Sequence, residues 1–228
     1  MPLVPSHPTS TRRTHSSSVR QALRALLLCV ALAGPCAALA GPQQYEPMSE
    51  SVRAALHSTV ADAGAPSLLI ADPAEAEAWL ADMSRRLEKR IPDAAYREEL
   101  LVTIHYEATR AGLDPQLVLA LIQVESGFRK YAVSSAGARG YMQVMPFWID
   151  VIGEKGDNLF HMRKNLRYGC TILRHYLDIE KGDLFRALGR YNGSLGKATY
   201  PNLVRGAWDN HWSYQPLKVA ASSGGVSR

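Results

Sequence analysis

Downstream of Asp93, apolar residues recur every three or four positions, which is the spacing of amphipathic helices. Asp93 can cap the first of these helices, and Gly112 can end it. Its apolar positions are Tyr96, Leu100, Ile104, Ala108 and Ala111. Asp114 and the proline after it open a second helix over 116–126, which is apolar on almost every side. A helix without a polar face is predicted to lie in the middle of a core.

Other helical signals lie on both sides of this pair. Asp72 as a cap and Pro73 at the first helical position predict a helix over 74–90. Residues 134–140 are a loop of mostly small side chains. Further helices are predicted over 146–152, 165–179, 184–190 and 200–212. No segment keeps the alternation of a strand for long, so the predicted fold class is all-α.

The flanking segments have a different composition. Residues 41–73 are rich in Pro, Ala, Ser and Gly and are predicted to form a tether with one short helix, while the Ser/Gly-rich end is predicted to be disordered. The 74–90 helix either packs on the main domain or docks a partner. The predicted division is an export signal at 1–40, a linker with a helical extension at 41–92, a helical domain at 93–216 and a disordered tail at 217–228.

The formal net charge of the 228-residue chain is +5 at pH 7, which by itself favours an anionic partner such as nucleic acid. The charge is unevenly distributed, however. Residues 1–40 contain four arginines and no acidic residue, so the rest of the chain has 22 Lys and Arg against 21 Asp and Glu. A strongly basic binding surface therefore loses its support, and no nucleic-acid partner is predicted.

Residues 1–40 have the pattern of an export signal. A segment rich in Arg, Ser and Thr ends at Arg24, residues 25–33 are apolar, and Ala38-Leu39-Ala40 matches a small-x-small cleavage site. The apolar segment is too short to span a bilayer comfortably, so cleavage after Ala40 is favoured over an uncleaved anchor. The predicted location is the cell envelope, in the periplasm, with no integral membrane span after cleavage.

Cys170 is the cysteine that remains once the signal, with Cys29 and Cys36, is removed. It then has no partner for an internal disulfide, and its position in an apolar helical stripe predicts a buried thiol rather than a nucleophile. The sequence contains no His-Glu-x-x-His motif and no Cys/His cluster. Neither a metal nor another cofactor is therefore predicted.

Glu125 is the candidate for chemistry, because it and Gln123 are the polar residues that interrupt the apolar helix over 116–126. An apolar surrounding and the negative end of a helix dipole both raise the pKa of a carboxyl group. A raised pKa is what a general acid needs near neutral pH. The alternative is a surface glutamate that pairs with Arg129 or Lys130 just beyond the helix.

The segment after Glu125 suits a sugar ligand. Its small residues, at 134–140, allow a backbone and a ligand to approach closely. Tyr141, Met142 and Gln143 follow. An aromatic ring, a thioether and an amide match the apolar faces and the polar groups of a sugar.

Four motifs occur in order along the chain. They are Glu125-Ser126 at a helix end, Gly137-x-x-Gly140-x-Met142-Gln143-x-Met145-Pro146, Asn165-Leu166-x-x-Gly169 and Tyr191-Asn192-Gly193. In this order and spacing they resemble the motifs of the soluble-type (SLT) lytic transglycosylases, whose catalytic domain is similar to goose-type lysozyme. The resemblance covers roughly residues 93–215.

The resemblance implies cleavage of the β-1,4 bond between N-acetylmuramic acid and N-acetylglucosamine in peptidoglycan. It implies that Glu125 protonates the leaving oxygen and then, as a base, takes the proton of the muramyl C6 hydroxyl, which closes a 1,6-anhydro ring. Ser126 would orient Glu125. The residues that would contact substrate are Ser134, Met142, Gln143, Tyr191 and Asn192. General wall remodelling and service to a secretion, conjugation or pilus machine both stay open as roles.

Three departures from the family pattern bear on substrate preference. Tyr141 stands where the family usually has Leu, and Phe128-Arg129-Lys130 lacks the frequent Asn-Pro. Arg190 stands where Ala is commoner, and it is a candidate for binding the carboxylates of peptidoglycan stem peptides.

Two other functions are compatible with these residues. A hydrolase on the same fold would need a second carboxylate to position water, for which Asp150, Glu154 and Asp157 are candidates by their proximity in sequence. A noncatalytic peptidoglycan-binding component of an envelope assembly would keep the cleft without turnover. The presence of Glu125 argues against that second alternative.

Overall fold

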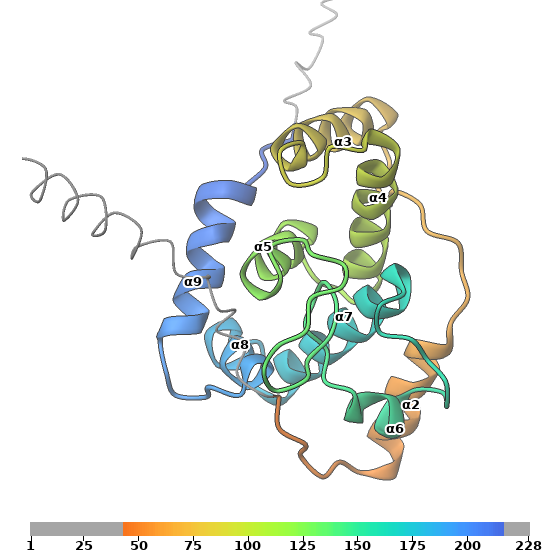
Figure 1. Cartoon of the computed structure of the whole chain (residues 1–228), viewed down its shortest axis with the longest axis vertical. Coiled ribbons are helices and arrows are strands. Elements are labelled where there is room, and N and C mark those ends of the chain that lie inside the picture. The colour runs from red at the N-terminus through yellow and green to blue at the C-terminus, as the bar shows by residue number, and fades with distance from the viewer. Residues whose placement is uncertain (1–42, 217–228) are drawn as a thin grey trace, which may run out of the picture. The chain divides into compact units, whose positions relative to one another are not determined.

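The structure is a computed structural model that describes residues 43–216. The predicted export signal at 1–40 and the predicted disordered tail at 217–228 lie outside the described residues. The helices are α2 (Glu50–Ala61), α3 (Pro73–Leu87), α4 (Ala94–Arg110), α5 (Pro115–Glu125), α6 (Phe147–Ile152), α7 (Met162–Ile179), α8 (Leu184–Asn192), α9 (Thr199–Ala207) and the π-helical turn η2 (Trp208–Trp212) (Figure 1). Within 43–216, β-pairing is limited to isolated bridges in the loop before α6. The predicted all-α class is confirmed.

Aspartates cap four of the helices, among them the three predicted at Asp72, Asp93 and Asp114. The side chains of Asp72, Asp93, Asp114 and Asp183 each accept a hydrogen bond from a backbone N–H in the first turn of α3, α4, α5 and α8. These N–H groups have no partner within a helix, so a carboxylate satisfies them and complements the positive end of the helix dipole.

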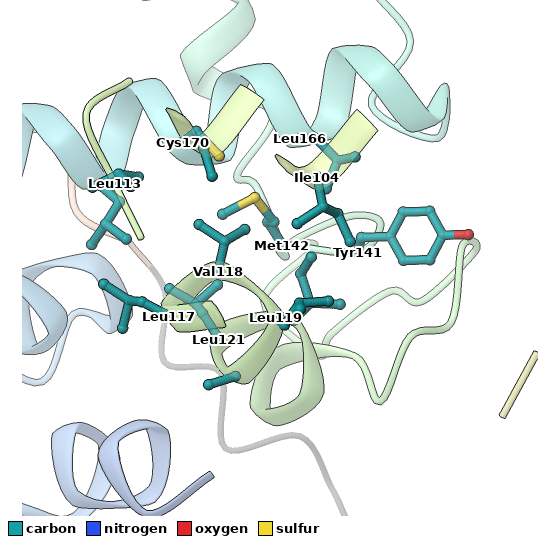
Figure 2. Packing of buried hydrophobic residues seen from close by; sticks show 14 of the residues in the cluster. Ile104, Leu113, Leu117, Val118, Leu119, Leu121, Tyr141, Met142, Leu166 and Cys170 are labelled. Carbon is teal, nitrogen blue, oxygen red and sulfur yellow. The ribbon is translucent and has the colours of Figure 1, made fainter. Parts of the chain in front are cut away.

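Helix α5 lies in the core, as its lack of a polar face predicts. All six residues from Leu117 to Ile122 are buried. Helices α4 and α9 and the turn η2 pack around α5. In Figure 2 the loop residue Met142 lies between α5 and Cys170 of α7. Cys170 is 1% exposed, and burial raises the pKa of its thiol, as expected for a structural cysteine.

Several helix boundaries differ from the sequence prediction, and α3 ends at Leu87 instead of residue 90. Helix α7 begins at Met162, three residues before the predicted start, so Asn165 lies within its first turns and turns its side chain to the neighbouring loop. The last predicted helix ends at Ala207 and continues as the wider turn η2. Trp212 at the end of that turn is buried and donates an indole hydrogen bond to Gln123 of α5, at 3.0 Å.

The extension before Asp93 packs on the helical domain. Trp79, Met83 and Leu87 of α3 are buried, and α3 contacts α4. Helix α2 contacts α6 and α7. Arg110 of α4 holds the end of α2 through a hydrogen bond to the Thr59 carbonyl at 2.7 Å. The extension is therefore an outer layer of the domain. None of the described helices is long and apolar enough to cross a membrane.

Candidate active site

Glu125 is the last residue of α5, and its side chain is turned into the protein. The residue is 2% exposed, and the apolar turns of α5 come directly before it. One carboxyl oxygen, Oε1, accepts a hydrogen bond from the Tyr200 hydroxyl of α9 at 2.5 Å. The other oxygen, Oε2, is buried and has no hydrogen-bond partner in the structure. A buried polar atom without a partner is costly, so its presence points to function.

The surroundings of Glu125 favour its protonated form. Burial raises the pKa of its carboxyl group from an ordinary 4.5 to about 8, and the Tyr200 hydrogen bond opposes part of that rise. Transfer out of water disfavours the ionised form, whereas a donor to the carboxylate favours it. At neutral pH the carboxyl group therefore holds a proton that it can donate.

The loop at 139–144, which leads to α6, is held by Asn165 of α7. Its side-chain oxygen accepts a hydrogen bond from the Met142 N–H at 2.8 Å, and its amide nitrogen donates to the carbonyls of Arg139 and Leu159 at 2.8 and 2.9 Å. Gly140 passes so close to this amide that an added Cβ would lie 2.4 Å from the Asn165 nitrogen. Two motifs that are separate in sequence thus form one packed unit.

Met142 anchors the same loop from inside the core. We expected its side chain to line a cleft, but it is fully buried. A Cβ on Gly169 of α7 would lie 2.3 Å from the Met142 sulfur, so the glycine makes room for the thioether. The partly exposed methionine of this segment is Met145.

Gln143 is the polar side chain that this loop brings inside. Its backbone has a positive φ of 49°, a left-handed conformation that is uncommon outside glycine. Its amide nitrogen donates to the carbonyls of Ala132 and Gly140, at 3.1 and 2.8 Å. Its amide oxygen is buried without a partner. Gln143 and Glu125 therefore each have a buried oxygen without a hydrogen-bond partner.

Tyr191 of α8 links the loop to Glu125. Its hydroxyl donates to the Met142 carbonyl at 2.7 Å, and its ring is 1% exposed. The pKa of this phenol is raised well above its ordinary value, first by burial and then by the nearby charge of Glu125. The ionisable groups of Tyr191 and Glu125 therefore interact electrostatically.

A comparison with known protein families finds a match for most of the helical domain. Residues 103–203 match the family model described as "Transglycosylase SLT domain". These residues form an SLT domain. The family resemblance of the four motifs is thereby confirmed. Glu125, Gln143, Tyr191 and Tyr200 all lie within the matched range.

The relatives carry names of the same kind. The "Transglycosylase" of Enterobacteria phage PRD1 is 34% identical over 98 residues, which are 43% of this chain and 36% of the phage protein. The "Membrane-bound lytic murein transglycosylase C" of Histophilus somni (strain 2336) is 36% identical over 119 residues, 45% of this chain and 33% of that protein. The protein of that name from Haemophilus influenzae (strain PittGG) is 45% identical over 112 residues, 42% of this chain and 31% of that protein. The chain thus spans about a third of the length of these relatives.

Three other expected site residues lie at helix ends or in a loop, namely Ser126, Asn192 and Ser134. The Ser126 hydroxyl donates to the Ile122 carbonyl at 3.2 Å, which ties it to the end of α5. The Ser134 hydroxyl accepts from the Ala138 N–H at 3.1 Å within its own loop. Asn192 is buried at the end of α8, before Gly193 with a φ of 74°. The two serine contacts are therefore local, one at the end of α5 and one within the loop at 134–138.

Tyr200 is the site residue that the sequence reasoning missed. It lies 75 residues after Glu125, at the start of a helix that was predicted only from its apolar spacing. No local motif distinguishes it from the other tyrosines of the chain. The only available signal was its position on a helix that follows the Tyr191 motif.

Among the candidate second carboxylates, Asp157 has structural partners. It accepts a hydrogen bond from the Tyr168 hydroxyl at 2.6 Å and pairs with Lys164 at 2.9 Å. Within 43–216, no three His, Cys, Asp or Glu side chains are grouped so that they could hold a metal ion.

Proposed function

We propose that this chain is a peptidoglycan lytic transglycosylase that cleaves the β-1,4 bond between N-acetylmuramic acid and N-acetylglucosamine. The observation that carries the proposal is the Glu125 carboxyl group, which is buried, has a pKa of about 8 and keeps one oxygen unpaired. The SLT domain and the names of the relatives support the reaction class.

In the first step Glu125 is the acid. Its Oε2 donates a proton to the glycosidic oxygen while the bond from that oxygen to C1 of the muramyl residue breaks. The N-acetylglucosamine side leaves as an alcohol, and positive charge develops at C1. The carboxylate formed at the same moment lies next to that charge and stabilises it. The Tyr200 hydrogen bond stabilises the new carboxylate in turn.

In the second step the same carboxylate is the base. It takes the proton of the muramyl C6 hydroxyl while O6 attacks C1, which forms the 1,6-anhydro ring. Glu125 ends as it began, protonated, and no water is consumed. This cycle needs one carboxyl group whose pKa lies close to the working pH, which agrees with a value of about 8.

The neighbouring residues have supporting roles in this proposal. The unpaired amide oxygen of Gln143 can accept a hydrogen bond from a sugar, and Tyr191 can contact the sugar beside Glu125. Ser126 orients the end of α5. Ser134 and Asn192 border the substrate path. Met142 supports the loop from the core instead of contacting the sugar.

We place the enzyme in the cell envelope, most simply in the periplasm, because peptidoglycan is its substrate. Its partners are then glycan strands, either in general wall remodelling or beside a secretion, conjugation or pilus machine. The names of the Histophilus and Haemophilus relatives, which include "membrane-bound" and "murein", are compatible with this location.

The alternative function is a hydrolase on the same fold. It would release reducing muramic ends, because water instead of O6 would attack C1. Asp157 is tied to Tyr168 and Lys164, so it is a poor candidate for positioning that water. No specific contact favours a noncatalytic binding role.

Product analysis tests the proposal. Purified wild-type protein is incubated with peptidoglycan sacculi, and the soluble muropeptides are identified by mass spectrometry. We expect 1,6-anhydromuramyl ends, whose mass is lower by one water than that of reducing ends. We expect Glu125→Gln to lower the rate by about 10³-fold, because the amide has no proton to donate. Reducing ends, or unchanged activity in Glu125→Gln, would overturn the proposal.

A further inference from the structure

Gln43 is a buried glutamine on an otherwise exposed stretch of chain. We call residues 43–48, which precede α2, the N-terminal arm. Gln43 is 4% exposed, whereas residues 44–47 are exposed and Met48 is half-buried. The arm is therefore attached to the domain largely through one inserted side chain.

The Gln43 carboxamide is held by two hydrogen-bond donors. Its oxygen accepts a hydrogen bond from the indole N–H of Trp148 at 2.9 Å and from the backbone N–H of Met145 at 3.3 Å. Both donors follow Gln143 in the chain, Met145 in the loop before α6 and Trp148 in α6 itself. Gln43 also lowers the pKa of the Tyr191 phenol of α8, which donates to the Met142 carbonyl of the same loop.

Two further arm residues contact the same surface. The Glu46 carboxylate pairs with Arg190 of α8, with an oxygen–nitrogen distance of 2.6 Å. The ring of Tyr45 meets that of Phe147 edge-on, with centroids 6.0 Å apart. Arg190 is the residue for which the sequence suggested stem-peptide carboxylates as ligands, and it pairs with Glu46 and Glu180.

The arm side chains that make these contacts carry the same chemical groups as the proposed substrate. A glutamine side chain ends in the same C=O and N–H groups as the acetamido group of an N-acetylated sugar. A glutamate carries the carboxylate of a muramyl lactyl group or a stem peptide. Met145, which binds Gln43, lies two residues after Gln143, so the Gln43 carboxamide lies on the loop that carries the proposed sugar-binding amide.

We propose that the N-terminal arm is an internal competitor of the glycan, with the Gln43 carboxamide in a position that takes a sugar acetamido group and Glu46 in place of a substrate carboxylate. This inference rests on the proposed function and adds to it a means of control. Glycan must displace the arm before it can bind beside Glu125. Residues 44–47 are exposed to solvent.

The inference predicts that loosening the arm strengthens saccharide binding. Apparent affinity is the intrinsic affinity multiplied by the fraction of molecules with the arm released. Gln43→Ala removes the carboxamide and its hydrogen bonds, so we expect the dissociation constant to fall roughly three- to thirtyfold. Glu46→Gln removes an exposed ion pair, and a fall of about two- to fivefold is expected.

The experiment measures binding of tri-N-acetylchitotriose by titration calorimetry in a Glu125→Gln background, where no turnover occurs. Gln44→Ala is the matched control, because it changes an exposed glutamine next to Gln43 and should leave the affinity unchanged.

The outcomes separate this inference from the proposed function. Unchanged or weaker chitotriose binding in both Gln43→Ala and Glu46→Gln would overturn it, because the arm would then be a structural part of the groove. In otherwise wild-type protein, Gln43→Ala should lower KM on peptidoglycan and leave kcat within about twofold. If the wild type releases no anhydro ends but Gln43→Ala still tightens chitotriose binding, the proposed reaction fails and the competition stands.

Discussion

Two glutamates in consecutive helices are buried to almost the same extent and yet are held in opposite ways. Glu107 of α4 is 1% exposed, and Glu125 of α5 is 2% exposed. The Glu107 carboxylate forms a two-point contact with Arg167, through Nη2–Oε1 and Nε–Oε2 distances of 2.8 and 3.1 Å. Arg110 and Arg163 add longer contacts, at 3.4 and 3.3 Å. The Glu125 carboxyl group has one hydrogen bond, from a neutral tyrosine.

The difference shows that the effect of burial on a carboxyl group depends on its ion-pair and hydrogen-bond partners. Arginines compensate the charge of Glu107, so this carboxylate joins α4 to α7 and stays fixed. Within the described residues no cation pairs with Glu125, and its burial is balanced by uptake of a proton. The first glutamate is suited to hold the fold together, and the second is suited to transfer a proton.

The largest stability effect is expected at Glu107. Glu107→Gln leaves Arg167, which is itself 5% exposed, without its two-point partner. We expect the free energy of unfolding to fall by about 3–5 kcal/mol, because a buried charge loses its compensation. Urea denaturation at pH 7 measures this. Glu98→Gln, on an exposed position of the same helix, should change it by less than about 0.5 kcal/mol.

The activity of Glu107→Gln tests whether the two glutamates have different roles. Glu107→Gln protein that is folded at low temperature should still release anhydro muropeptides at close to the wild-type rate per folded molecule. A loss of activity as large as that of Glu125→Gln, in folded protein, would show that Glu107 takes part in the chemistry and would end the distinction between the two glutamates.

The second effect is a dependence of stability on pH that comes from Glu125. Its pKa is about 8 when folded and near 4.5 when exposed, so between these values the folded state keeps a proton that the unfolded state releases. The stability that this group contributes is fully present below pH 4.5 and is lost as the pH rises through 8. Relative to Glu125→Gln, the wild type should lose on the order of 3 kcal/mol between pH 5 and pH 8.

Denaturation of wild type and Glu125→Gln at both pH values measures that difference. The amide does not titrate, so the variant serves as the reference for all other ionisable groups. Parallel curves for the two proteins across this range would mean that Glu125 has an ordinary pKa, and the acid–base cycle would then lack its physical basis.

The sequence predicted the parts of this picture that depend on local chemistry. Asp114 and Pro115 mark the start of α5 because capping and a fixed φ act within one turn. The burial of Glu125 followed from the apolar residues on every side of its helix. Gly140 and Gly169 could be identified as close approaches of the backbone only once the partners Asn165 and Met142 were known.

The parts that could not be predicted depend on contacts across the fold. Tyr200 reaches Glu125 over 75 residues, and Gln43 reaches Trp148 over 105 residues. No helical period encodes such pairs, because they arise from how α9 and the N-terminal arm pack. Met142 illustrates a related limit, since a methionine next to a polar residue fits a cleft and a core equally well until its neighbours are known.

The smallest expected effect tests the contact that gives Glu125 its one donor. Tyr200→Phe removes the hydroxyl that stabilises the ionised carboxyl group, so the pKa of Glu125 should rise further, by about one unit or less. The basic limb of the pH–rate profile should move to higher pH by that amount, and kcat should fall about three- to tenfold, since the carboxylate formed in the first step loses its donor. Tyr168→Phe is the matched control, because it removes a tyrosine–carboxylate hydrogen bond at Asp157. A basic limb that stays in place in Tyr200→Phe, or moves equally in Tyr168→Phe, would mean that the phenol of Tyr200 only packs beside Glu125 and that burial alone sets its proton affinity.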